Sequence, residues 1–114
     1  MSGVCTKMRG RSEASILEIA THLKRELYDA ELICDSSHRI DFVNVHVLTF
    51  EKYYFRNGSY ASLTVVLTEN GDEKTADIIG SGGGEGLFNI SWGANSSFAR
   101  EAENILNSYG LDIV

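Results

Sequence analysis

Hydrophobic residues recur at helical intervals near the start of the chain. The apolar positions that share one helical face are Ile16, Ile19, Ala20, Leu23 and Leu27. Positions three or four residues apart are neighbours on a helix surface, so this spacing is typical of an amphipathic helix. Ser15 and Glu18 have the S-x-x-E spacing of a capping box, which satisfies amides in the first turn. The pattern predicts a helix that begins near residues 12–15 and packs on an apolar partner.

Two Asn-Gly dipeptides indicate that this partner is a meander of antiparallel strands. Asn57-Gly58 and Asn70-Gly71 each separate alternating segments, and Asn-Gly favours the positive φ angles of tight hairpin turns. Two-residue turns at these sites pair Phe50 with Val65 and Val65 with Ala76. Directly paired residues point to the same side of a sheet. The predicted apolar face is therefore Leu48, Phe50, Tyr54, Ala61, Leu63, Val65, Leu67, Ala76 and Ile78.

The opposite sheet face has the mixed composition of a surface nearer to water. It carries Thr49, Glu51, Tyr53, Tyr60, Ser62, Thr64, Val66, Thr75, Asp77 and Ile79. We take Tyr53, Tyr60, Val66 and Ile79 as candidate interface residues, because tyrosine is enriched in recognition surfaces. The alternative is a partly exposed sheet made of ordinary β-forming residues.

Further elements flank this meander. Residues 32–36 predict a short strand, and a β-bulge near Val47 would reconcile the phase of Val43 and Val45 with that of Leu48. Residues 87–92 predict a fifth strand. The closing helix is predicted to start from caps at Asn95, Ser96 and Ser97. Its apolar stripe is Phe98, Ala102, Ile105, Leu106 and Tyr109, and Gly110 stands where a left-handed cap would end it.

These elements predict an α+β fold in the order αβββββα. We expect a two-layer sandwich in which an N-terminal and a C-terminal helix cover one face of an antiparallel sheet of about five strands. The second face is open or used for association. With 114 residues and 43% hydrophobic residues, the chain fits one domain of ordinary globular composition. We expect a flexible basic tail over residues 1–11 and a single domain over residues 12–114.

The charge balance argues against nucleic-acid binding. The predicted tail contains Lys7, Arg9 and Arg11, which leaves 7 basic against 16 acidic residues, hence −9, on the predicted domain. Nucleic-acid affinity comes largely from basic groups that neutralise phosphates, so such a body would repel a strand. The chain lacks an apolar run long enough to span a membrane or to form a signal peptide, so we expect neither.

A glycine-rich segment from Gly80 to Gly86 is the most conspicuous candidate for ligand binding. Its candidate residues are Gly82, Gly83, Gly84 and Glu85, because glycines let a backbone approach a ligand or cradle an anion. Glu85 stands where a dinucleotide fingerprint needs glycine, and no Lys-Ser/Thr pair follows as in a P-loop. The alternative is a plain link between strands.

Histidine and cysteine spacing does not predict a metal site. Cys34 and His38 would lie about 13 Å apart in an extended strand, too far to share one ion, and His22 is expected to be solvated. We therefore expect no metal, no cofactor and no catalytic residue. Cys5 and Cys34 lack the C-x-x-C spacing of a redox motif, which fits a reduced, cytoplasmic protein.

Several segments resemble one family of small bacterial proteins classed as a domain of unknown function. They are Glu51-Lys52-Tyr53-Tyr54, Asn57-Gly58, Leu63-Thr64-Val65, Asn70-Gly71 and Ser81-Gly82-Gly83. The resemblance covers roughly residues 15–109. It implies this fold and a bacterial cytoplasmic origin, and it assigns no catalytic residue.

The sequence therefore leaves the biochemical function unknown. Our leading hypothesis is a non-catalytic binding or regulatory module that self-associates as a dimer, since homo-oligomers most often close with two-fold symmetry. The alternative is a small-ligand binder or an enzyme that uses the Gly80–Gly86 loop. A flat apolar patch would favour the first, and a concave pocket beside the loop would favour the second.

Overall fold

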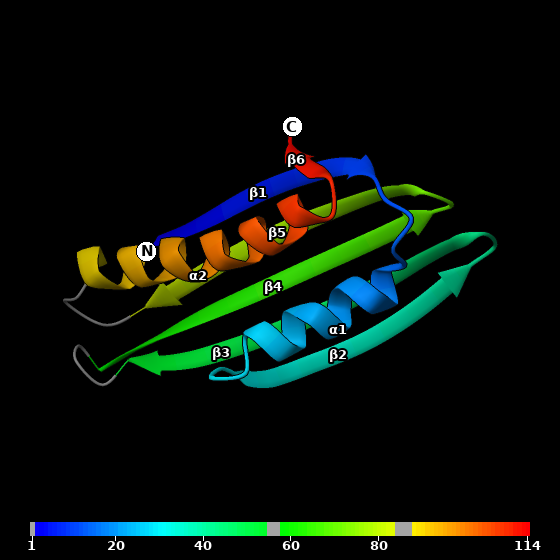
Figure 1. Ribbon diagram of the computed structural model, residues 1–114. Helices are drawn as coiled ribbons and strands as arrows, with labels where there is room; N and C mark the ends of the chain where they lie inside the picture. The colour runs from blue at the N-terminus through cyan, green and yellow to red at the C-terminus, as the bar shows by residue number, and fades with distance from the viewer. Residues whose placement is uncertain (1, 55–57, 84–87) are drawn as a thin grey trace.

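The computed structural model describes residues 2–54, 58–83 and 88–114, with side chains except those of residues 2, 54, 59, 83 and 88–96. The elements follow the order β1 (Ser2–Arg11), α1 (Ile16–Glu26), β2 (Glu31–Ile40), β3 (Val43–Tyr54), β4 (Ser59–Asn70), β5 (Glu73–Gly83), α2 (Phe88–Ser108) and β6 (Leu111–Ile113). The strands form one antiparallel six-stranded sheet in the order β2-β3-β4-β5-β1-β6. Both helices lie on the same face of this sheet (Figure 1). The predicted α+β class and helix-on-sheet layering are confirmed.

The hydrophobic core lies between the sheet and the two helices. Helix α1 packs on β3 and β4, and α2 packs on β5, β1 and β4. The sheet contributes the predicted apolar residues Leu48, Phe50, Ala61, Leu63, Val65, Leu67, Ala76 and Ile78, all buried. The helices contribute Ile16, Ile19, Ala20, Leu23, Phe98, Ala102 and Leu106, which are buried as predicted.

The predicted strand register is wrong by two residues at both hairpins. Phe50 pairs with Leu63, and Val65 pairs with Ile78. The second turn consists of Gly71 and Asp72, one residue later than predicted, with Gly71 at a φ of 65°, which glycine adopts without strain. A slip of two residues keeps every side chain on its own face, whereas a slip of one reverses it. The predicted faces are therefore correct despite the wrong partners.

The N-terminal segment is a strand rather than the flexible tail predicted over residues 1–11. Residues 2–11 form β1, which pairs with β5 along its whole length and lies between β5 and β6. Met8 is buried in the core, and Thr6 donates a hydrogen bond to Glu103 of α2 at 3.1 Å. The basic residues Lys7 and Arg9 occupy the alternate, exposed positions. These basic residues lie on only one side of the strand, so their charge wrongly suggested a flexible tail.

Two other predicted elements differ from the observed ones. Residues 88–92, expected in a fifth strand, and Asn95, Ser96 and Ser97, expected as helix caps, all lie within α2, and Leu87 lies outside the described residues. A short apolar run has the same appearance in a strand and in a buried helix, so this segment misled the assignment. The irregularity predicted near Val47 lies in β2 instead, between Leu32 and Cys34.

The helix ends agree with the sequence signals. Ser15 is the N-cap of α1, and its hydroxyl accepts a hydrogen bond from the Glu18 amide at 3.1 Å. Gly110 has a φ of 93° just after α2, the left-handed conformation expected of a C-terminal cap. Both local signals were therefore read correctly.

Candidate functional site

The sheet face opposite the helices is a surface with a defined chemistry. In the described part of the chain both helices lie on the other side, so this face, which we call the open face, is uncovered (Figure 1). Its aliphatic side chains include Val43, Val45, Val47, Val66 and Ile79, together with the exposed Ile40 of β2. The three valines of β3 continue the odd-numbered positions Thr49 and Glu51, so no bulge is needed to place them. The open face is therefore more apolar than the sequence reading indicated.

The four candidate interface residues all lie on the open face, but they form a strip rather than one cluster. Tyr53 and Tyr60 are direct cross-strand partners, and their ring centroids lie 4.8 Å apart at 52°. Val66 and Ile79 lie further along the strands, beside Asp77 and Thr64 respectively. From Tyr60 to Thr64 the chain advances about 13 Å. The strip therefore crosses the middle of the sheet.

Polar side chains join these apolar positions across the strands. Thr49 and Thr64 have hydroxyls 3.3 Å apart, and Ser62 and Ser81 have hydroxyls 2.8 Å apart. Because these groups bond to each other, less of their hydrogen-bonding capacity is lost when the face is covered.

Charge accumulates toward β1 at one side of the open face. Arg9 lies 3.8 Å from Glu73, and Arg11 lies 2.6 Å from Asp72. These pairs are exposed, with side chains 44% to 71% accessible. The open face thus carries its valines on β3 and β4 and these exposed ion pairs beside β1.

The glycine-rich segment is divided by the structure. Gly82 and Gly83 belong to β5 and pair with β4, and Gly82 also pairs with β1. Gly84 and Glu85 lie outside the described residues. Gly82 and Gly83 thus take part in the sheet ladder, and ligand binding by this segment stays a prediction.

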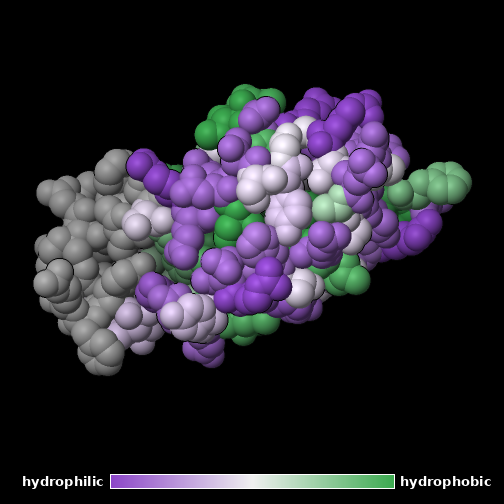
Figure 2. Space-filling model, in the orientation of Figure 1, coloured by the Kyte–Doolittle hydropathy of each residue, from purple (hydrophilic) through white to green (hydrophobic). Residues whose placement is uncertain are grey.

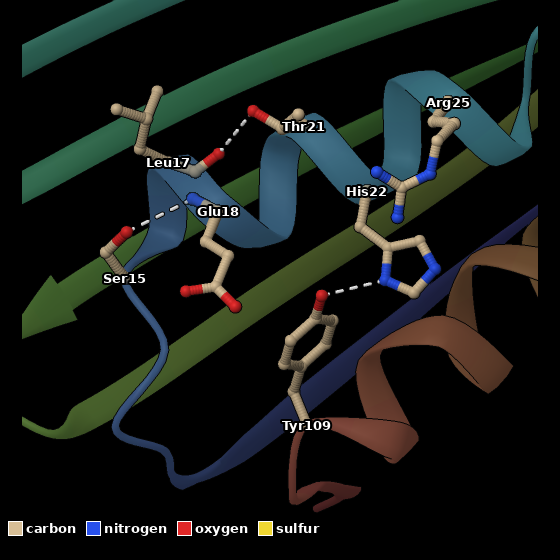
Figure 3. A pocket seen from close by; sticks show the side chains of 7 residues that line it. All are labelled: Ser15, Leu17, Glu18, Thr21, His22, Arg25 and Tyr109. Carbon is tan, nitrogen blue, oxygen red and sulfur yellow. Dashed lines mark hydrogen bonds between the residues drawn. The ribbon is translucent and has the colours of Figure 1, made fainter.

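A groove of about 480 Å³ lies between α1 and the residue that follows α2 (Figure 3). Its lining is Ser15, Leu17, Glu18, Thr21, His22, Arg25 and Tyr109. His22 is half-buried, and its Nδ1 lies 2.7 Å from the Tyr109 hydroxyl, with the rings edge to face. The expectation of a solvated His22 is therefore wrong. The His22 ring connects the middle of α1 to the end of α2. The charged groups of the groove, Glu18 and Arg25, are exposed to solvent.

A chain of polar side chains connects α1 to strands β2 and β3. The His46 Nε2 atom lies 2.6 Å from Asp35, and Lys24 of α1 donates to the other Asp35 oxygen at 2.8 Å. The Lys24 ammonium, and then the His46 ring, hold the pKa of the Asp35 carboxyl below its usual value. His46 is buried at 4% exposure.

A second buried ionic group lies beneath the start of α1. Lys74 is 2% exposed and donates to the backbone oxygens of Ser12 and Gly71 at 2.8 and 2.7 Å. Its ammonium also lies 3.3 Å from Glu69, whose carboxylate accepts from the Ile16 amide at 3.1 Å. Sequence reasoning missed both Lys74 and His46. The signal available in the sequence was their position in the strand. Lys74 is two residues from the buried Ala76, and His46 is two residues from the buried Leu48, so each pair lies on the same face of the sheet.

Within residues 2–54, 58–83 and 88–114, no group of three or more His, Cys, Asp or Glu side chains is arranged to hold a metal ion. No helix in the same ranges combines the length and apolar character needed to cross a membrane. The described chemistry therefore includes an open sheet face, a solvent-exposed groove and two internally bonded ionic groups.

Comparison with known proteins places the chain in a family. No curated protein matches it. A family model described as a family of unknown function, DUF6054, matches residues 1–110, which includes β1 and nearly all of the sheet. The chain therefore belongs to this family of unknown function.

Proposed function

We propose that this protein is a non-catalytic binding module that self-associates into a symmetric dimer through its open face, in a reducing compartment such as the bacterial cytoplasm. The observation that supports it is a complete sheet face without a covering layer, whose apolar residues lie on β3, β4 and β5. Apolar side chains on an uncovered face gain free energy when a second layer removes them from water. A second copy supplies such a layer, and two sheets pack face to face about 10 Å apart.

The size of the open face fits a stable dimer. Strands β3 and β4 each have 12 residues, so they extend for about 40 Å at about 3.3 Å per residue. Four neighbouring strands at about 4.8 Å spacing are about 19 Å wide, which gives roughly 760 Å². Stable interfaces bury about 800 Å² per partner. Face-to-face contact over four strands therefore comes close to this area.

The opposite side of the molecule is less suited to association. The helix side carries mainly hydrophilic side chains, with hydrophobic ones scattered among them (Figure 2). Of the ionic groups on that side, Asp35 and Lys74 are bonded to their own neighbours, so neither of these two offers a free acid or base for catalysis. Both observations favour the open face as the functional surface.

Sedimentation velocity tests this proposal at tens of micromolar protein. We expect the wild type to sediment as a dimer and Tyr60→Asp as a monomer with an unchanged circular dichroism spectrum. Tyr60 is 52% exposed in the protomer, so aspartate is tolerated there, whereas a buried unpaired carboxylate would disfavour the interface. Leu17→Asp is the matched control, because Leu17 is 61% exposed on the helix side, and this variant should stay dimeric. A wild-type monomer at this concentration would refute the proposal.

A further inference from the structure

We infer that the two-fold axis of this dimer runs along the strands between β3 and β4, so that Cys34 is buried against Ile79 of the partner while Cys5 stays outside the contact. The inference rests on the proposed function and specifies how the second copy is oriented. Its basis is the order in which side chains follow one another across the open face.

Two neighbouring rows of side chains determine the pattern. In the strand order β2, β3, β4, β5, β1, the first row is Ser36, Val47, Val66, Asp77 and Lys7. The second row is Cys34, Thr49, Thr64, Ile79 and Cys5. The apolar pair of the first row lies on β3 and β4, and its charged pair lies on β5 and β1.

A two-fold axis that runs perpendicular to the strands along the first row is disfavoured by charge. If it passed through the first row, Val47 and Val66 would each meet their own copies. The same axis would set Asp77 against Asp77 of the partner, and Lys7 against Lys7 of the partner. Like charges brought together away from water are strongly unfavourable.

An axis along β4 is disfavoured by desolvation. It would lay β3 of one protomer over β5 of the other, and so place Val47 against Asp77 of the partner. Burying a carboxylate against an aliphatic side chain removes its hydration without supplying a hydrogen bond. This arrangement would therefore lose much of the free energy gained by burying the valine side chains.

In these two rows, an axis between β3 and β4 avoids both costs. It lays β3 over β4 of the partner, so Val47 meets Val66 of the partner twice by symmetry, and Thr49 meets Thr64 in the same way. It also lays β2 over β5 of the partner, where Ser36 meets Asp77 and its hydroxyl can donate a hydrogen bond. Strand β1 overhangs the contact, so Lys7 and Arg9 remain in water.

The same axis makes the two cysteines different. Cys34 on β2 lies opposite Ile79 of the partner, whereas Cys5 is carried by the overhanging β1. Stacked sheets are rotated by about 30° relative to each other, which moves these partners by only a few Å because β2 lies close to the axis. In the protomer Cys5 is exposed and Cys34 is partly buried, and neither forms a disulfide.

Thiol alkylation tests this orientation with the native cysteines. Cys5→Ser leaves Cys34 as the reporter, Cys34→Ser leaves Cys5, and each is also combined with Tyr60→Asp as a monomeric reference. The rate of iodoacetamide labelling is followed by mass spectrometry. Where nine chains in ten are dimeric, we expect Cys34 to react about tenfold more slowly than in the monomeric reference, because only the free chain exposes it. Cys5 should react equally fast in both.

The outcomes separate this inference from the proposed function. A dimer in which Cys34 is not protected, or in which Cys5 is protected as well, overturns the axis while the dimer stands. A wild-type monomer overturns both. As a second measurement, Ser36→Lys should tighten the dimer by about two- to fivefold through an ion pair with Asp77 of the partner, whereas Arg9→Gln on the overhang should leave its affinity unchanged. A weaker or unchanged dimer with Ser36→Lys would contradict the arrangement.

Discussion

Replacing Lys74 by methionine should destabilise the protein strongly, because the buried ammonium of Lys74 bonds to its neighbours beneath the start of α1. Methionine has a similar length and fills the same space, so the variant removes hydrogen bonds without leaving a large cavity. It would leave the Ser12 and Gly71 carbonyls without their ammonium donor. It would also leave the Glu69 side chain, only 14% exposed, without its counter-charge.

The size of this loss in stability depends on the hydrogen bonds that Glu69 retains. Breaking a buried ion pair by removing one partner costs about 3–5 kcal/mol. Glu69 still accepts hydrogen bonds from the Ile16 amide and from the Asn44 side chain, each at 3.1 Å, so we expect the lower end, about 3 kcal/mol. Adding Glu69→Gln neutralises the unpaired charge, so the double variant should lose about 1 kcal/mol less than the sum of the two single variants.

Urea unfolding at pH 7, followed by circular dichroism, measures these values. Arg11→Met is the matched control, because Arg11 forms a 2.6 Å ion pair with Asp72 in which both side chains are more than half exposed. Exposed pairs contribute about 0–1 kcal/mol. If Lys74→Met stays within about 1 kcal/mol of the wild type, the ionic group beneath α1 does not stabilise the fold as described.

Two further predictions concern the sheet and the polar chain at β2. Leu63→Ala should cost about 2–5 kcal/mol, because Leu63 is fully buried on the central part of β4, and Thr64→Ala on the open face should cost far less. Equal losses in urea melts would contradict the assignment of the two faces. Because the folded-state pKa of Asp35 is lowered, chiefly by Lys24, its contribution is present above the unfolded pKa and is lost as the pH falls through the folded value. Between pH 7 and pH 3 the wild type should therefore lose more stability than Asp35→Asn, and equal losses in the two proteins would refute this.

The parts of the fold that could be predicted from sequence are those set by local periodicity. The helix stripe around Leu23 and the alternation around Leu63 each depend on residues a few positions apart, and both faces were assigned correctly. The exact register was not, because the turn at Gly71-Asp72 differs from an Asn70-Gly71 turn by one residue. Moving a turn by one residue shifts the cross-strand partners by two residues. Alternation alone does not detect that shift, because a slip of two residues keeps every side chain on its own face.

The parts that could not be predicted depend on contacts between distant segments. Nothing local to residues 2–11 reveals that their partner strand is β5, about seventy residues later. The burial of Lys74 likewise depends on where Ser12 and Glu69 meet. The strip of interface candidates was found because tyrosine and alternation are visible in sequence. The valines of β3 were not assigned to the open face, because a bulge was predicted near Val47 to bring them into line with Leu48.

The position of β1 also has a consequence for how the chain folds. Strands β2 to β5 are joined by short turns, so their pairing closes small loops that form quickly. The β1–β5 ladder instead joins residues 2–11 to residues 73–82, and such non-local pairing is slow because the loop entropy is lost before the contacts form. During synthesis β1 therefore stays unpaired, with Met8 uncovered, until β5 has left the ribosome. Of all the strands in this sheet, the one translated first completes its pairing among the last.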